Sequence, residues 1–236
     1  MRIRIAIGVA ASVLCTGAAR ATTTVYLNRC AEGCVFAPGP DDSRTDHSSI
    51  VSATSSLSAF AHGDPSFAAV VACVQTELAP FDVEVTTVDP GDAPHFEIAV
   101  AGTPQQLGLP SGVEAVSPLT CALVPNGIAF SFANQIGDQP QRICATAAQT
   151  VGNLVGLEFV TTCGDAMAFD VSTCLPKAFL DEDAPCGTTA PSACICGGTT
   201  QNSYQQMLAT LPEPAGAAGA GVALLALAAV ARRRAA

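Results

Sequence analysis

Two segments of the chain carry apolar residues at the spacing of an α-helix. The first covers residues 66–78, where Asp64-Pro65-Ser66 is a start signal and Pro80 a stop. The second begins at Gln141 and ends at Gly156, a residue suited to a C-cap. The apolar positions are Phe67, Val70, Val71, Val74 and Leu78 in the first helix, and Ile143, Ala147, Val151, Leu154 and Val155 in the second.

Alternating apolar and polar residues predict strands between these helices. Residues 81–85 alternate Phe, Val and Val with polar residues, and residues 96–100 repeat the pattern after an Asp-Pro-Gly-Asp turn. We expect these two strands to pair or to be neighbours. Shorter strands are predicted at 113–116 and 128–132, and a last helix at 202–211.

The order of these elements predicts one α+β domain. Residues 34–58 are rich in Pro, Gly, Ser and Asp, which is typical of loops, so residues 22–63 read as a loop-rich N-terminal segment. The domain itself is expected over residues 64–211, with no internal repeat. Residues 1–21 and 212–236 have a different composition and are expected to be sorting signals.

The N-terminal 21 residues have the pattern of a secretory signal peptide. Two arginines precede an apolar run over residues 5–15, and Ala19-Arg20-Ala21 supplies a cleavage site of the A-x-A type. A buried N-terminal helix is the alternative. The export signal predicts a mature start near Thr22 and a location outside the cytoplasm.

The C-terminal 25 residues have the pattern of a short membrane span. Residues 215–231 carry no charge and would rise roughly 25 Å as a helix, the lower limit for crossing a bilayer. The arginines after this span would stay in the cytoplasm, which places the preceding domain outside. The order of Pro212-Glu213-Pro214, apolar span and Arg232-Arg233-Arg234 resembles the PEP-CTERM sorting signal of exported bacterial proteins.

This resemblance implies a specific processing partner. An exosortase-type membrane transpeptidase would cleave near Pro212-Glu213-Pro214 and pass the protein to the cell envelope, its outer surface or the medium, after secretion and transient anchoring in the inner membrane. A permanent C-terminal anchor is the alternative.

Composition and charge exclude several classes of protein. Hydrophobic residues make up 49% and charged residues 13%, which does not fit a disordered chain. Between residues 22 and 211 there are four basic and nineteen acidic residues. A body this acidic repels phosphate backbones and anionic lipids, so no nucleic acid is expected as a partner.

Ten cysteines follow the signal peptide, an even number that predicts a disulfide framework in an exported protein. We expect Cys121 to pair with Cys144, Cys163 with Cys174, and Cys186 with Cys194 or Cys196. Cys194-Ile195-Cys196 is too closely spaced for a zinc knuckle, so no metal or other cofactor is expected. The full set is Cys30, Cys34, Cys73, Cys121, Cys144, Cys163, Cys174, Cys186, Cys194 and Cys196.

Other polar groups do not form a known site in the sequence. His47, His62 and His95 are scattered and read as ordinary surface residues. Asp181-Glu182-Asp183 lacks the ligand spacing of a calcium loop and reads as a solvated acidic turn.

The segment after Cys144 resembles the active-site helix of metzincin-type zinc metallopeptidases, whose pattern is H-E-x-x-H-x-x-G-x-x-H/D. Two histidines one turn apart share a helix face there, and a glycine turns the chain toward the third ligand. Gly156 stands at the turn glycine, and Gly164-Asp165-Ala166-Met167 resembles the methionine turn under such sites. The resemblance covers residues 64–211 and implies a zincin-like fold, a mixed twisted sheet with an active-site-like helix.

The residues that would perform the chemistry differ from the pattern. The first histidine position holds Gln149, the general-base position Thr150, the second histidine position Asn153 and the third-ligand position Phe159. Neutral amides are poor zinc ligands, and threonine cannot accept a proton from a metal-bound water at neutral pH.

We therefore expect an exported pseudo-metallopeptidase without catalytic activity. It would bind a peptide or protein ligand by strand addition, or act as a structural surface protein. The alternatives are an active secreted metallopeptidase with atypical ligands and a purely structural envelope or matrix protein.

Overall fold

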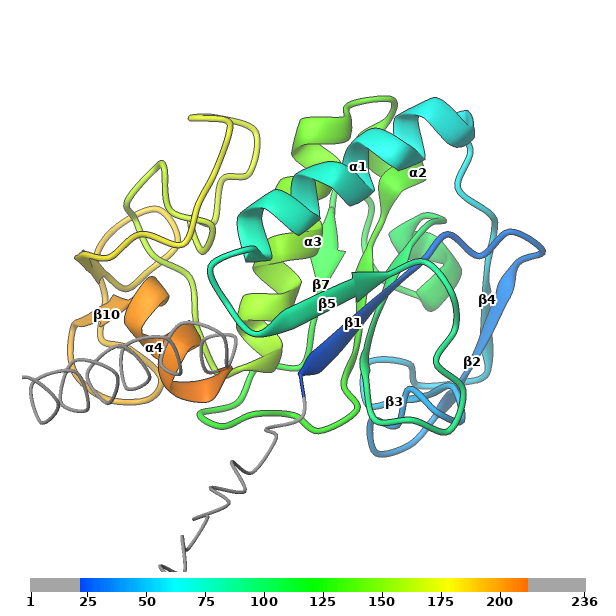
Figure 1. Cartoon of the computed structure of the whole chain (residues 1–236), viewed down its shortest axis with the longest axis horizontal. Coiled ribbons are helices and arrows are strands. Elements are labelled where there is room, and N and C mark those ends of the chain that lie inside the picture. The colour runs from blue at the N-terminus through cyan, green and yellow to red at the C-terminus, as the bar shows by residue number, and fades with distance from the viewer. Residues whose placement is uncertain (1–21, 212–236) are drawn as a thin grey trace, which may run out of the picture.

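The computed structural model describes residues 22–211, which form a mixed α+β structure with disulfide bonds (Figure 1). Its main sheet has five strands in the order β5-β1-β6-β8-β7. The first four strands in this order are parallel, and only β7, at one edge, is antiparallel to its neighbour. The strands are β1 (Thr23–Asn28), β5 (Val83–Thr86), β6 (Phe96–Val100), β7 (Ala115–Val116) and β8 (Ile128–Ser131).

Two long helices, α1 (Gly63–Leu78) and α3 (Pro140–Leu154), cover one face of this sheet. Val25, Leu27 and Ile98 point into the layer between sheet and helices and are fully buried. The apolar stripes of both helices face the same layer, since it also contains Val70, Val74 and Val151. The helical periodicity seen in the sequence therefore builds the main core.

The opposite face of the sheet is covered by a smaller three-stranded sheet and loops. β2 (Cys34–Pro38) lies between β3 (His47–Ser48) and β4 (Ser55–Leu57). Phe36 from β2 packs edge-on against Phe130 from β8, with ring centroids 5.0 Å apart. The remaining elements are η1 (Pro104–Leu107), α2 (Ala133–Ile136), β9 (Asp183–Pro185), β10 (Thr200–Asn202) and α4 (Ser203–Thr210).

The predicted helices and strands are confirmed in place, but one predicted pairing is wrong. Residues 81–85 and 96–100 do not pair, because β1 lies between β5 and β6 and is hydrogen-bonded to both. β1 comes from the segment expected to be loop-rich, and Val25 and Leu27 alternate there with polar residues. Residues 22–63 thus supply an interior strand of the sheet to which the predicted 64–211 domain contributes the other four.

Five disulfides join the ten cysteines. The predicted Cys163–Cys174 pair is confirmed, and Cys186 pairs with Cys194. The expected Cys121–Cys144 pair is wrong, because Cys144 faces α1 and pairs with Cys73 there, while Cys121 pairs with Cys196. The fifth bridge is Cys30–Cys34.

Among residues 22–211, no helix is long and apolar enough to cross a membrane. The predicted signal peptide and the predicted sorting signal, with Pro212, Glu213, Pro214, Arg232, Arg233 and Arg234, lie outside the described residues.

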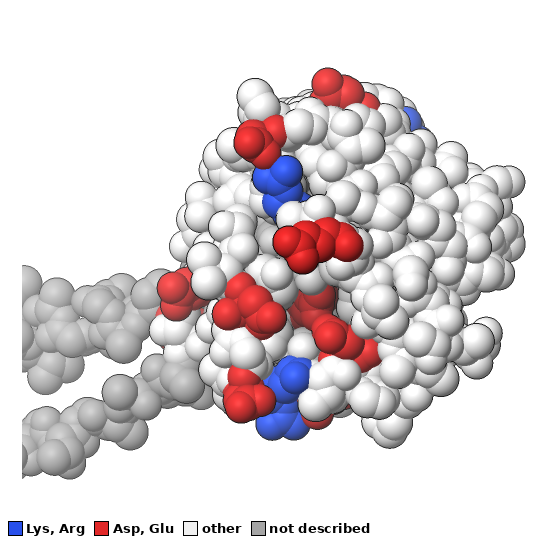
Figure 2. Space-filling view, turned by 90° about the vertical axis from the view of Figure 1, so that its right-hand side faces the viewer, with Lys and Arg blue, Asp and Glu red and all other residues white. Residues whose placement is uncertain are grey.

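All four basic side chains between residues 22 and 211 have partners. Arg29, Arg44 and Arg142 form ion pairs with Asp64, Asp42 and Glu114 respectively. Lys177 is buried and its Nζ donates to the backbone carbonyls of Cys163 and Asp170, at 2.6 and 2.7 Å. Acidic side chains dominate the charged surface on the face shown in Figure 2.

Candidate functional site

Two adjoining cavities lie between the β7 edge of the sheet and the C-terminal loops. Their volumes are about 640 and 410 Å³, and both are lined by Phe159 and Thr189. Residues 111–115 form one wall of the larger cavity, and residues 169–171 line it from the loop after α3. Arg142, Thr146 and Gln149 of α3 also line it, so the helix that resembles a metallopeptidase active-site helix borders this groove.

The edge strand β7 presents unpaired backbone groups. β7 pairs with β8 through the partners Ala115–Ser131 and Val116–Phe130, and the N–H of Phe132 donates to the carbonyl of Glu114 at 2.8 Å. Because the backbone groups of successive strand residues point to opposite sides, those of Ala115 point away from β8. No other described strand pairs with β7, and Ala115 lines the larger cavity.

Gln149 and Asn153, two of the positions that the sequence resemblance assigns to metal ligands, lie together on α3, and their side chains are hydrogen-bonded to backbone. Gln149 and Asn153 are one turn apart and both 5% exposed. The Gln149 amide donates to the carbonyl of Ala168 at 2.7 Å, and the Asn153 amide donates to the carbonyl of Leu157 at 2.9 Å. The hydroxyl of Thr150 donates to the carbonyl of Ala147, one turn earlier in the helix. All three polar side chains therefore donate hydrogen bonds to backbone carbonyl groups.

The chain turns at Gly156 directly after α3, where the sequence pattern predicts a turn, and Phe159 follows this turn. Gly156 has φ of +91°, a conformation that side-chain-bearing residues rarely adopt, and backbone atoms of Cys121 lie 3.3 Å from where its Cβ would be. After the turn, Phe159 reaches the groove and packs edge-on against Phe169, with ring centroids 5.2 Å apart. The third-ligand position therefore contributes an aromatic wall, which has no atom that binds metal.

Glu158, the carboxylate nearest to this position, is tied into the loop structure. Its carboxylate accepts a hydrogen bond from the backbone N–H of Ile195, and its own backbone N–H and C=O are bonded by the Gln201 side chain at 3.1 and 2.6 Å. Glu158 is buried and anchors the C-terminal loops to the end of α3.

Met167 packs directly against α3. Its side chain is fully buried, and a Cβ on Gly152 would clash with its Sδ and lie 3.2 Å from Phe179. The absence of a side chain at Gly152 thus lets the Met167 turn approach the helix next to Asn153. Asp165 fixes this turn, since its carboxylate accepts from the N–H of Met167 and from the hydroxyl of Ser203, both at 2.7 Å.

We expect Gly152→Ala to lower the free energy of unfolding by about 2 kcal/mol, because the new methyl group overpacks the Met167 contact. Chemical denaturation measures this loss. Gly164→Ala is the matched control, since a Cβ at Gly164 meets no atom within 4 Å. Equal stability of the two variants would contradict the close packing of Met167 on α3.

Two charged side chains at the groove, Arg142 and Asp170, are held by neighbouring residues. Arg142 makes a two-pronged ion pair with Glu114, one residue before β7, and so links α3 to the edge strand. Asp170 accepts hydrogen bonds from Ser172 and Thr173, which hold the pKa of its carboxyl below the usual range. The groove therefore contains the Arg142–Glu114 ion pair, and the rest of its wall includes aromatic and aliphatic side chains.

Residues 22–211 contain two clusters with the composition of a metal site, and neither fits a metal in the bridged protein. They are Cys73 with Glu77 and Cys144, and Glu158 with Cys186 and Cys194. The cysteines of each cluster are joined in a disulfide, so no thiolate is left to bind a metal.

The three histidines form hydrogen bonds to residues outside α3. His47 contacts Thr45, His62 contacts the carbonyl of Ala133, and His95 contacts the carbonyl of Ala93. The prediction that His95 is a surface residue is wrong, since packing under Tyr26 leaves it only 3% exposed. Asp181, Glu182 and Asp183 are exposed as predicted.

Sequence reasoning did not identify most of the groove. Val113 belongs to a predicted strand, but Phe169, Val171 and Thr189 lie in loops without a recognisable pattern. The available sequence signal was the apolar run Ala166-Met167-Ala168-Phe169, which lies outside every predicted helix and strand. Comparisons of the chain with protein-family models, with curated proteins and with solved structures give no match.

Proposed function

We propose that this chain is an exported, non-catalytic peptide-binding protein built on a degenerate metallopeptidase-like domain of the zincin kind. Several contacts support the kinship: Gln149 and Asn153 share one turn of a helix packed on the sheet, Gly156 turns the chain after it, and Met167 packs against it. The chain would be a pseudoenzyme, because the groups at the ligand and base positions neither bind zinc well nor accept a proton from water.

The observation that carries the binding role is the free backbone edge of Ala115 inside a groove. An extended peptide can add a strand there by hydrogen bonding to the N–H and C=O of Ala115, while its side chains contact the groove walls. Phe169 is 49% exposed and lines the cavity together with Val113 and Phe159. The groove therefore offers both backbone pairing and apolar contact, which a peptide with alternating apolar residues would use.

We expect Phe169→Ala to weaken peptide binding about tenfold or more, since exposed aromatic residues at the centre of a binding groove contribute strongly to affinity. A displayed library of random decapeptides, selected on the full chain, supplies the probe, and fluorescence anisotropy of the selected peptides gives the affinity. Val88→Ala is the control, because Val88 is 74% exposed and is not part of the groove.

Two results would overturn this function. If the library yields no peptide that binds at the groove, the result would favour a role as a structural surface protein. Stoichiometric zinc in the purified chain, with chelator-sensitive cleavage of an unfolded protein substrate, would establish the active metallopeptidase instead.

Export and sorting form the second part of the proposal. The signal peptide would direct secretion, and the C-terminal signal would engage an exosortase-type transpeptidase after transient insertion of the apolar span in the inner membrane. Five disulfides among the described residues fit an oxidising compartment outside the cytoplasm.

Intact mass and terminal peptides of the protein made by a bacterium with this sorting pathway should show a start near Thr22 and an end near Pro212. A product that retains residues 215–236 would show that the span is a permanent anchor. A product that retains residues 1–21 would contradict cleavage at Ala21.

A further inference from the structure

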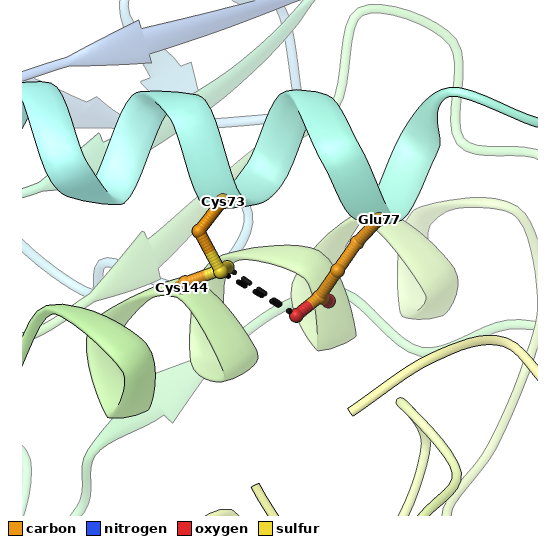
Figure 3. Close-up of side chains that lie close together, drawn as sticks. All are labelled: Cys73, Glu77 and Cys144. Atoms are coloured by element: carbon orange, nitrogen blue, oxygen red, sulfur yellow. Dashed lines mark hydrogen bonds between the residues drawn. A yellow bond between two sulfur atoms is a disulfide. The ribbon is translucent and has the colours of Figure 1, made fainter. Parts of the chain in front are cut away.

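The disulfide between the two long helices lies against the partly buried carboxyl group of Glu77 (Figure 3). Cys73 and Glu77 are one turn apart on α1, and Cys144 faces them from α3. Oε1 of Glu77 lies 3.3 Å from Sγ of Cys144 and 3.7 Å from Sγ of Cys73. Oε2 of Glu77 is buried without a hydrogen-bond partner among the described residues.

A hydrogen bond between Glu77 and the bridge needs a proton on the carboxyl group. The sulfurs of an intact disulfide carry no hydrogen, so only a protonated Glu77 can donate across the 3.3 Å to Cys144. Burial favours this neutral form and raises the pKa of Glu77 to about 8, against the opposing positive charge of Lys177.

Few other charged groups act on this carboxyl. Gln141, on the first turn of α3, is neutral and lies 3.8 Å from Sγ of Cys73. From the C-terminal loops, Lys177 is the charged group that faces Glu77, and Asp165 and Asp170 act in turn on Lys177. Glu77 thus carries a proton next to the bridge through neutral pH.

The two sulfurs differ in access. Cys73 is partly exposed, whereas Cys144 is fully buried. Attack by a thiolate from solvent is therefore directed to Cys73, and Cys144 becomes the leaving sulfur. A thiolate left in this buried position would be strongly disfavoured by desolvation unless it received a proton.

We propose that Cys73–Cys144 is a thiol–disulfide exchange site, in which an incoming thiolate attacks Cys73 and Glu77 protonates the departing sulfur of Cys144. In the first step the S–S bond breaks, a mixed disulfide forms on Cys73, and the carboxyl proton moves to Cys144. A second thiol of the same dithiol then displaces Cys73 as a thiolate, which takes up a proton. The dithiol is oxidised to its disulfide, and the bridge is reduced by two electrons.

The reaction partner is thus a dithiol, either a small molecule or the reduced motif of a redox protein. Reduction would untie α1 from α3, the helix that borders the peptide groove, because no other bridge in residues 22–211 joins these helices. This inference does not depend on the peptide-binding role.

The test follows each bridge of the folded full chain during reduction by dithiothreitol. Samples are quenched with an alkylating reagent and mapped by mass spectrometry between pH 6 and 10, and rates are divided by the thiolate concentration. We expect the normalised rate at Cys73–Cys144 to fall about tenfold or more as the pH passes about 8. Glu77→Gln should give a low rate without this fall.

Internal controls separate the proposal from simple opening of the structure. Cys163–Cys174 is exposed at both ends and should show the same flat profile in both proteins. Gln141→Ala should leave the profile of Cys73–Cys144 unchanged, since Gln141 contacts only the Cys73 side. Reduction of the buried Cys186–Cys194 bridge in step with Cys73–Cys144 would indicate unfolding and overturn the proposal.

A monothiol identifies the sulfur that is attacked. Glutathione should be found on Cys73, and an adduct on Cys144 would overturn the direction of attack. Superimposable pH profiles of wild type and Glu77→Gln would overturn the role of Glu77. If Glu77→Gln does not fold, as judged by circular dichroism, the wild-type profile and the adduct position decide the question.

Discussion

Removing the Cys121–Cys196 bridge should lower the free energy of unfolding by about 4 kcal/mol. The two cysteines are 75 residues apart, and the bridge joins the loop before β8 to the C-terminal loops. Its loss frees a long closed loop in the unfolded chain, which favours unfolding through chain entropy. Both cysteines are exposed, so replacing them with serine leaves no core cavity. Urea unfolding of Cys121→Ser/Cys196→Ser without reductant measures the effect.

The matched control is Cys163→Ser/Cys174→Ser. These cysteines are also exposed, but their bridge closes a loop of only 11 residues, so we expect a loss of about 3 kcal/mol. The difference between the variants isolates loop length, because the chemistry of both substitutions is the same. An equal loss, or a larger one for the short loop, would contradict the entropic origin of the effect.

Between pH 5 and pH 8 the free energy of unfolding of the wild-type protein should fall by on the order of 3 kcal/mol, and Glu97→Gln should abolish this fall. Glu97 is 1% exposed on β6, and burial, with the charges of Asp46 and Asp89, raises its pKa to about 8 despite a hydrogen bond from Asn28. The folded protein thus holds a proton that the unfolded chain has released. This contribution is fully present below the unfolded pKa and is lost as the pH rises through about 8.

Glutamine keeps the oxygen that accepts from Asn28 at 2.7 Å but cannot ionise. Denaturant unfolding at several pH values should therefore give a flatter profile for this variant and a higher stability than wild type at pH 8. Glu84→Gln, at an exposed position on β5, is the control and should keep the wild-type profile. A variant that loses stability at pH 8 would contradict the protonated, buried state of Glu97.

Local sequence patterns predicted the helices and strands of this fold better than they predicted which strands pair. The stripes around Val70 and Val151 defined both long helices, since a buried helix face leaves a clear period in the sequence. β1 was missed because it begins two residues after the predicted signal peptide and includes two threonines and an asparagine. Without β1, the strands 81–85 and 96–100 became neighbours by default, and no local signal could show the insertion between them.

The site was predictable only where it lies on α3. Gln149, Thr150 and Asn153 could be placed on one helix from spacing alone, and Met167 was expected near it. Their amide and hydroxyl contacts depend on the loops around Ala168 and Leu157, which have no period. Long-range pairs such as Cys73–Cys144 depend on how two helices meet, whereas the short Cys163–Cys174 loop could be paired from separation in the sequence.

The pairing of every described basic side chain affects how copies of this protein meet. With Arg29, Arg44 and Arg142 held by carboxylates and Lys177 buried, residues 22–211 offer no unpaired cation to the acidic surface of another copy. Two molecules that approach each other therefore repel over roughly one Debye length, about 10 Å at 0.1 M salt. This repulsion is strongest in dilute buffer, and concentrated salt weakens it by screening.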